Sequence, residues 1–374
     1  MPPLHAVELR KVDGRALTLY ADAPFDPPPS PAPSPFAEPL GAAPHLRWHP
    51  LRGEWVTYAA YRQGRTFLPP AQWNPLAPTR DAAAPTEVPP GDWQIAVFDN
   101  RFPAFVPGAP APDARERPGT VVPTAPATGR CEVVVFGQDP ATPLGSLPLA
   151  RIELLLRVWT DRCARLAATP GIAYALPFEN RGAEVGVTLH HPHGQIYAYP
   201  VVPPVPARMA AVAREHASRH GTGPLGTMIA RELADGARLL YRGSHAIAFV
   251  PACARYPYET WVAPIAPAAG FGDLDGAAIA DLARALKTVL RKFERLWDRP
   301  FPYLMAWYPA PLGGPAGAAA GWHLHAQLWP PYRTRDRLKY LAGTELAAGL
   351  FAMDVLPEAT ARELQAIDVS GELR

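Results

Sequence analysis

The feature that most constrains the fold of this 374-residue chain is a pattern that occurs twice. Residues 191–198 read His-Pro-His-Gly-Gln-Ile-Tyr-Ala, and residues 323–330 read His-Leu-His-Ala-Gln-Leu-Trp-Pro. Both follow the order His-x-His-small-Gln-aliphatic-aromatic, at a separation of 132 residues, which is far longer than a solenoid period. A long amphipathic helix is expected before each copy. The pattern therefore predicts a duplicated unit whose two sheets join into one, with coincidence as the alternative.

The first copy carries residues suited to chemistry on a phosphate. In an extended strand, residues i and i+2 share a face, so we expect His191, His193 and Gln195 to point to one side. An imidazole can attack phosphorus when its other nitrogen is held as a donor, and an amide N–H can stabilise phosphoryl oxygens. His193 is the better nucleophile, because Gly194 beside it lets a ligand approach, and His191 is expected to be an orienting or structural group. A metal-binding pair and an ordinary surface strand are the alternatives.

The residues that precede the two copies differ. Asn180, Gly182, Gly186 and Thr188 precede the first copy, where exposed backbone N–H groups and short polar side chains suit a phosphate. A run rich in glycine and alanine, 313–320, precedes the second copy and lacks such polar groups. We therefore assign the chemistry to the first copy, and structural or partner-substrate duties to the second.

Hydrophobic periodicity predicts an α+β fold with antiparallel sheets. A hairpin is expected over 7–20 with its turn at Asp13-Gly14, and the proline-rich or irregular stretches 24–39, 69–93 and 107–129 are expected to stay outside the sheet. Further strands are expected at 45–65, 94–99, 131–136, 174–178, 237–250, 258–263, 301–308 and 322–329. Helices are expected at 147–168, 206–217, 224–235, 275–297 and 357–367.

Composition narrows the class of protein. A net charge of only +2 argues against a broad nucleic-acid or membrane-binding surface. Three distant cysteines, Cys131, Cys163 and Cys253, fit neither a disulfide framework nor a cysteine-based zinc site. No signal-peptide hydrophobic region and no membrane-length apolar run are present, so we expect a soluble, cytoplasmic protein.

The segment from Phe178 to Gly182, Gly186 and the residues 191–197 resemble the active-site signature of galactose-1-phosphate uridylyltransferases, a branch of the histidine-triad superfamily. Supporting matches lie at 53–56, 100–103, 301–303 and 339–345, so the likeness covers nearly the whole chain from about residue 7. It implies duplicated histidine-triad-like units with an antiparallel sheet flanked by helices. We therefore expect a hairpin and proline-rich linker over 1–44, a catalytic half over 45–204 and a second half over 205–374.

The resemblance also implies a ping-pong reaction in which His193 carries a covalent nucleotide. UDP-glucose would transfer UMP to His193 and release glucose-1-phosphate, and galactose-1-phosphate would then take the UMP. Gln195 matches the stabilising amide of the family. In the family, part of the site comes from a second subunit, so a homodimer is implied.

Further positions match residues that bind substrate in the family. Spacing alone suggests that the two arginines are ordinary solvated charges, whereas the resemblance places them near the phosphates. The matches are Arg62 and Arg65 at the phosphates, Asn100 at the nucleoside, Asn180, Gly186 and Thr188 in the phosphate loop, and Lys339, Tyr340, Ala342 and Glu345 at the hexose phosphate.

The chain departs from the family at its metal sites. The positions of the structural zinc ligands match Asn74, Ala77, Pro140 and His191, and one ligand cannot close a tetrahedral zinc site. A second family metal site, with a glutamate and three histidines, matches Met209, Tyr308, His325 and Gln327. We therefore expect no metal or other cofactor, and packing and hydrogen bonds in the vacated volume.

Two other functions compete with this interpretation. A sugar-nucleotide phosphorylase would use the same His193 but take inorganic phosphate as acceptor. The segment from Lys339 to Glu345 favours a hexose phosphate, because Glu345 can accept hydrogen bonds from sugar hydroxyls. A non-enzymatic nucleotide-binding module is the other alternative, and the intact His-Pro-His-Gly-Gln motif argues against it.

Overall fold

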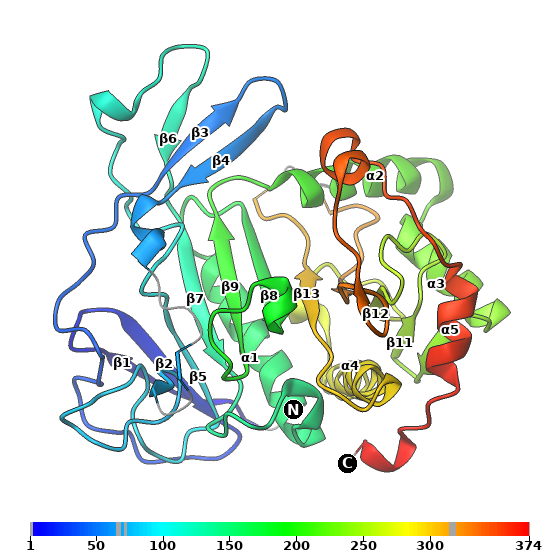
Figure 1. Ribbon diagram of the computed structural model, residues 1–374, viewed down its shortest axis with the longest axis horizontal. Helices are drawn as coiled ribbons and strands as arrows, with labels where there is room; N and C mark the ends of the chain where they lie inside the picture. The colour runs from blue at the N-terminus through cyan, green and yellow to red at the C-terminus, as the bar shows by residue number, and fades with distance from the viewer. Residues whose placement is uncertain (1–2, 65–68, 71–72, 314–318, 374) are drawn as a thin grey trace.

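A single 11-stranded sheet runs through the protein, and all of its strand pairs are antiparallel. The computed structural model describes residues 3–64, 69–70, 73–313 and 319–373 (Figure 1). The strand order is β1-β2-β5-β7-β9-β8-β13-β14-β12-β11-β10. In chain order these strands are β1 (His5–Arg10), β2 (Ala16–Ala21), β5 (Ile95–Asp99), β7 (Arg130–Val135), β8 (Tyr174–Arg181), β9 (His193–Tyr199), β10 (Leu239–Arg242), β11 (Ala246–Phe249), β12 (Thr260–Pro264), β13 (Tyr303–Tyr308) and β14 (His325–Trp329).

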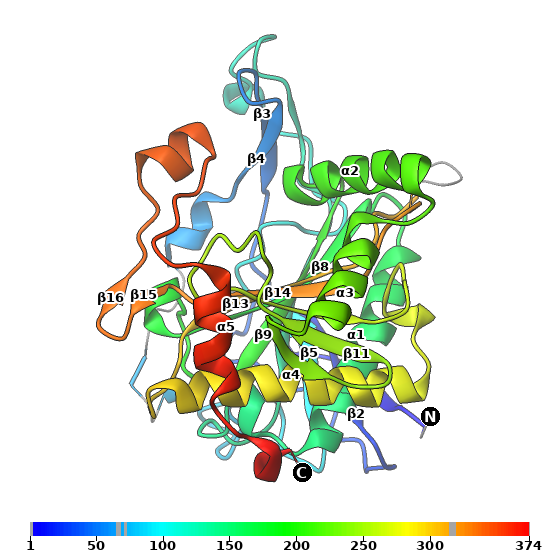
Figure 2. The ribbon, with the colours of Figure 1, turned by 90° about the vertical axis from the view of Figure 1, so that its right-hand side faces the viewer.

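Helices cover both faces of the sheet. The two longest, α1 (Leu149–Ala167) and α4 (Gly276–Leu296), contact each other and bury the main hydrophobic core against one face. On the opposite face, α2 (Pro204–His220) packs against β13, and α3 (Pro224–Asp235) packs against β11 and β12 (Figure 2). The remaining helix is α5 (Pro357–Gln365). No helix among the described residues is long and apolar enough to cross a membrane.

Proline-rich segments cover the second face in the N-terminal half. Proline has no backbone N–H to give to a ladder, so these segments pack as loops on the sheet. Ala32, Leu76, Val88 and Trp93 are buried there against side chains of β2, β5 and β7. The expected linker over 24–39 is therefore more ordered than predicted, since Ala32 also forms a parallel bridge with Lys11.

Two small sheets extend from the main one. A three-stranded sheet, in the order β4-β3-β6, projects as an arm at the upper left of Figure 1, and a short hairpin, β15-β16, lies at the left of Figure 2. Their strands are β3 (His45–His49), β4 (Glu54–Tyr58), β6 (Thr124–Pro126), β15 (Tyr332–Thr334) and β16 (Arg337–Leu338).

The predicted hairpin, the other sheet strands and the five helices are confirmed, with three differences in detail. The loop expected over 107–129 contains β6, which pairs with β3. The expected strand over 237–250 is a hairpin of β10 and β11, since Gly243 and Ser244 turn the chain. The expected strand over 45–65 is likewise two strands, joined at Gly53, whose positive φ of 64° suits a tight turn.

The duplication of the chain is visible in the sheet. In the first half β9 lies between β7 and β8, and in the second half β14 lies between β12 and β13. The two halves join where β8 pairs with β13, with Tyr303 opposite Arg181. The expectation that two sheets join into one antiparallel sheet is confirmed.

Candidate active site around His193

The first histidine motif lies on β9, whose side chains alternate between two faces. Ile196 and Ala198 are buried in the core beneath α1, and Gly194 shares their side. His193, Gln195 and Tyr197 lie on the other side, as the strand period requires. Of the three residues predicted to share this face, His193 and Gln195 belong to β9 and are confirmed there, and His191 lies just before the strand.

Gly194 is needed for packing and not for ligand approach. A Cβ at this position would lie 2.9 Å from the Phe136 ring and 2.9 Å from the carbonyl oxygen of Phe178. Both atoms belong to the interior, on the side opposite His193. The expectation that Gly194 opens a path to the histidine is therefore wrong, because the side-chain direction of residue 194 is opposite to that of residue 193.

His191 precedes β9, and its ring is held between a loop that covers the sheet and the backbone that follows β7. The ladder with β7 starts at His193 opposite Val135, and just before it the N–H of Phe136 donates to the carbonyl oxygen of Pro192 at 3.3 Å. The side chain of His191 is 2% exposed. Its Nε2 lies 2.8 Å from the carbonyl oxygen of Gly137, and its Nδ1 lies 2.9 Å from Nδ2 of Asn74. Because a carbonyl only accepts, Nε2 carries the proton, and Nδ1 accepts from the Asn74 amide.

The backbone of His191 fixes the tautomer of His193. Nδ1 of His193 lies 2.7 Å from the carbonyl oxygen of His191, so Nδ1 donates and Nε2 keeps its lone pair. Nε2 has no hydrogen-bond partner among the described residues. Burial lowers the pKa of His193 below its usual value, which favours the neutral ring. A neutral imidazole with a free Nε2 is the form that can attack an electrophile.

Two adjoining cavities bring the predicted phosphate and nucleoside residues to His193. One has a volume of about 310 Å³ and combines apolar walls such as Phe98 and Phe102 with polar groups that include Asn100, Thr188 and Gln195. The other measures about 130 Å³. Across the two cavities, the predicted residues that line them are Arg62, Asn100, Asn180, Gly186, Thr188, His193 and Gln195.

Arg62 and the loop before β9 are placed by local structure. Nη1 of Arg62 donates to the carbonyl oxygen of Phe102 at 2.7 Å and to the Tyr197 hydroxyl at 3.2 Å. Gly186 ends a short 3-10 turn with φ +77°, a conformation that lets the loop reverse next to the histidine. The other predicted arginine, Arg65, lies outside the described residues.

A third cavity, of about 410 Å³, is lined by His193 and also by Glu179, a carboxyl that the sequence does not single out. Glu179 is 2% exposed, and burial raises its pKa to about 7. The Tyr303 hydroxyl donates to its Oε2 at 2.8 Å, across the pairing of β8 with β13. Nearby, Arg181 forms an ion pair with Glu294 at 2.6 Å. The position of Glu179 beside Asn180 was the only available signal.

The predicted hexose-phosphate residues do not line the three cavities that touch His193. They belong to the segment after β16, which includes a short π-helical turn, Thr344–Ala348 (Figure 2). Nζ of Lys339 donates to the carbonyl oxygen of Ala352 at 2.6 Å. The Glu345 carboxylate accepts from the N–H of Ala342 at 3.1 Å and of Ala352 at 3.2 Å. The side chain of Tyr340 is 77% exposed.

The residues at the family's metal positions do not fit a metal ion. Among the described residues, no group of three or more His, Cys, Asp or Glu side chains is placed to hold one. At the first position, both ring nitrogens of His191 are hydrogen-bonded. At the second, the ring of Tyr308 stacks on that of His325, with centroids 5.2 Å apart. That the protein works without a metal stays a prediction.

The second motif repeats the backbone geometry of the first, but both ring nitrogens of its second histidine, His325, are hydrogen-bonded. Nε2 of His323 lies 2.8 Å from the carbonyl oxygen of Pro264, and Nδ1 of His325 lies 2.8 Å from that of His323. Nε2 of His325 lies 3.0 Å from Nε2 of Gln327 and accepts a hydrogen bond from it. Burial lowers the pKa of His325 to about 4. The lone pair on Nε2 of His325 therefore accepts a hydrogen bond, which agrees with assigning the chemistry to the first copy.

Comparisons with known proteins agree with this arrangement. A family model described as galactose-1-phosphate uridyl transferase, N-terminal domain, matches residues 36–203, and the corresponding C-terminal domain model matches residues 211–372. The galactose-1-phosphate uridylyltransferase of Thermotoga maritima is 32% identical over 87% of this chain and 98% of its own length. That of Streptomyces lividans is 34% identical over 81% of this chain and 80% of its own.

Solved structures of related proteins have the same fold. A uridylyltransferase structure matches with a TM-score of 0.75 at 30% identity, covering 86% of this chain and 97% of the other. An Arabidopsis thaliana ADP-glucose phosphorylase with bound ADP-glucose has a TM-score of 0.63 at 23% identity, over 87% of this chain and all of the other, and so shares the fold. From the two family models and the relatives above 30% identity, this chain belongs to the galactose-1-phosphate uridylyltransferase family.

Proposed function

We propose that this protein exchanges UMP between UDP-glucose and galactose-1-phosphate through a covalent uridylyl group on His193. The observation that carries the proposal is the state of that imidazole. Its Nδ1 donates to the backbone of His191, and its Nε2 has no hydrogen-bond partner in the described part of the chain and lies beside cavities lined by Arg62, Thr188 and Gln195. These cavities offer apolar walls to a nucleoside and cationic and amide groups to its phosphates.

Each half of the reaction exchanges one bond at phosphorus. In the first half, Nε2 of His193 forms a bond to the α-phosphorus of UDP-glucose, and the bond from that phosphorus to the bridging oxygen breaks. Glucose-1-phosphate leaves with the bonding electrons. In the second half, a phosphate oxygen of galactose-1-phosphate attacks the same phosphorus, and the bond to Nε2 breaks. The Gln195 amide and the Arg62 guanidinium stabilise the phosphoryl oxygens during both steps.

The depressed pKa of His193 supports this role. Attack requires the neutral ring, and protonation of Nε2 removes the nucleophile. Because burial lowers the pKa of this group, the neutral form persists to a lower pH than for a solvated histidine. The hydrogen bond to the His191 carbonyl also stabilises the positive charge that the ring acquires when Nε2 bonds to phosphorus.

A partial exchange reaction tests the double displacement. With no galactose-1-phosphate present, the protein should move label from radioactive glucose-1-phosphate into UDP-glucose, because the first half-reaction is reversible on its own. His193→Asn retains a donor for the His191 carbonyl but has no Nε2, so it should lose at least about 10³-fold in exchange rate. The matched control is His325→Asn in the second motif, which should exchange at close to the wild-type rate.

Failure of the wild-type protein to exchange label while it makes UDP-galactose would contradict the covalent route. A phosphorylase of the same fold is the second candidate, because an ADP-glucose phosphorylase is 23% identical over 348 residues. That activity would release a nucleoside diphosphate when inorganic phosphate replaces galactose-1-phosphate. The proposal expects little or no such product.

A homodimer with shared sites completes the proposal. Lys339, Tyr340, Ala342 and Glu345 do not line the cavities around His193 of the same chain. The segment that holds them exposes apolar side chains, with Leu346 at 63% and Leu350 at 71%. An apolar, projecting segment of this kind suits contact with a second copy of the chain. These residues would then serve the hexose phosphate in the site of the partner.

A further inference from the structure

We propose that Asn100 is a positioning residue that keeps the Gln195 amide away from the reactive nitrogen of His193. The inference rests on the proposed role of His193 as nucleophile. Nδ2 of Asn100 donates to Oε1 of Gln195 at 3.2 Å. This bond holds the carboxamide by its oxygen, while Nε2 of His193 has no partner among residues 3–64, 69–70, 73–313 and 319–373.

The second motif shows the arrangement that a glutamine adopts without such a donor. There, Nε2 of Gln327 donates to Nε2 of His325 at 3.0 Å, since Nδ1 of that ring already donates to the backbone. The amide thus engages the nitrogen that corresponds to the reactive one in the first motif. A lone pair that accepts a hydrogen bond is a weaker nucleophile, because the bond must break before attack.

Strand register traces the difference to one position. In the first half, Phe98 on β5 pairs with Val133 on β7, which pairs with Gln195. In the second half, Phe249 on β11 pairs with Trp261 on β12, which pairs with Gln327. The residue two places after Phe98 is Asn100, and the residue two places after Phe249 is Pro251. Proline has no side-chain donor, so nothing at this position can hold the amide of Gln327.

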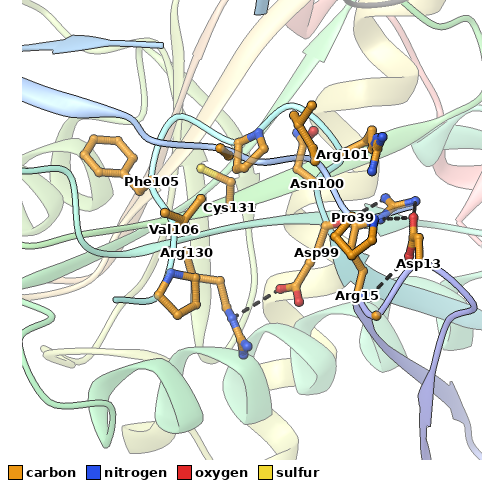
Figure 3. A pocket seen from close by; sticks show the side chains of 15 residues that line it. Asp13, Arg15, Pro39, Asp99, Asn100, Arg101, Phe105, Val106, Arg130 and Cys131 are labelled. Carbon is orange, nitrogen blue, oxygen red and sulfur yellow. Dashed lines mark hydrogen bonds and ion pairs between the residues drawn. The ribbon is translucent and has the colours of Figure 1, made fainter. Parts of the chain in front are cut away.

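Asn100 is itself held in place by its surroundings. Its backbone N–H donates to the carbonyl oxygen of Cys131 at 2.8 Å, and its Oδ1 accepts from the N–H of Phe102 at 2.9 Å. Figure 3 shows Asn100 near Arg101 and Cys131, among the residues that line a separate cavity of about 260 Å³. The Oδ1 bond fixes the plane of the amide and so directs Nδ2 toward Gln195.

The test measures the reactivity of His193 without any nucleotide. Diethyl pyrocarbonate acylates a free imidazole nitrogen, and peptide mass mapping reports the rate at His193 in the ligand-free protein. Asn100→Ala should slow this rate about 5- to 10-fold, the factor for a hydrogen bond of about 1 to 1.4 kcal/mol from Gln195 to Nε2. The double variant Asn100→Ala with Gln195→Ala should recover to within about two-fold of Gln195→Ala alone.

Recovery in the double variant separates this role from a merely structural one. If Asn100→Ala only disturbed the turn at Phe102, removing Gln195 would not restore the reactivity. An unchanged rate in Asn100→Ala, or a double variant as slow as Asn100→Ala, overturns the inference. Because the probe needs no sugar nucleotide, its outcome is independent of the exchange assay. A failed exchange with the predicted acylation pattern would instead count against the proposed function.

Discussion

The imidazole of His193 owes its state to hydrogen bonds whose partners lie far away in the chain. His191 presents its carbonyl to Nδ1 of His193, and the His191 ring is itself held by Asn74 and by the backbone of Gly137. Asn74 and His191 are 117 residues apart. This chain of contacts connects a proline-rich loop on the sheet surface to the proposed nucleophile, so a change at Asn74 should reach His193 through the His191 backbone.

Asn74→Ala should therefore lower the rate of nucleotide transfer more than it weakens substrate binding. The substitution leaves Nδ1 of a buried His191 without a donor, which costs about 1–3 kcal/mol in the free energy of unfolding. We expect kcat to fall about 10-fold, the factor for about 1.4 kcal/mol lost in the transition state, with KM changed by less. Steady-state kinetics together with urea unfolding measure both quantities. A raised KM at constant kcat would contradict a positioning role.

Asn74→Asp is the matched control for this contact. Aspartate can only accept, so its bond to Nδ1 requires His191 to be doubly protonated, and the folded-state pKa of His191 would rise in this variant. The stability from that pair would then be present at low pH and lost as pH rises through the raised pKa. Wild type should lack this loss, because its amide donates to a neutral ring.

The nucleophile could be predicted from the sequence, whereas the residues that hold it could not. His193 and Gln195 share a strand face by the two-residue period alone. The same two-residue period predicts that Gly194 faces the interior, where Phe136 and Phe178 leave no room for a Cβ. The contacts from Asn74 and Asn100 join segments 117 and 95 residues apart, and no local pattern encodes them. The buried Glu179 was missed because its burial depends on Tyr303 from the other half.

Strands and helices followed their local patterns wherever the core determined them. The helix α4 begins where the Asp275 side chain accepts from the N–H of Ala278, and its apolar side packs against the sheet. The strand β6 was missed because it is only three residues long, ends at a proline, and forms by pairing with β3. The proline-rich segments were correctly excluded from the main sheet, but their packing over β2, β5 and β7 depends on long-range contacts.

The repeated motif predicted the plan of the whole molecule. Two units related by duplication place β8 and β13 next to each other, and their pairing makes one sheet from two. The motif does not predict where the segment from Lys339 to Glu345 lies. It projects from one half and stays off the cavities around the His193 of its own chain.

Complementation between two inactive variants tests whether that segment serves a partner. Glu345→Gln should inactivate the site that the segment enters, and His193→Asn should inactivate its own site. In a mixed dimer with shared sites, one site has both wild-type residues, so co-refolding the two variants should restore about a quarter of the wild-type activity. If His193 and Glu345 act within one chain, the mixture should stay as inactive as its components.

The covalent intermediate on His193 is tested most directly by the mass of the protein after brief mixing with UDP-glucose. One uridylyl group should be added per chain. It should map to the peptide that contains His193, be lost in acid, and disappear when galactose-1-phosphate is added. His193→Asn should stay unmodified, whereas His325→Asn should be labelled like wild type. An active wild-type protein that acquires no adduct, or acquires it on another residue, would contradict the account.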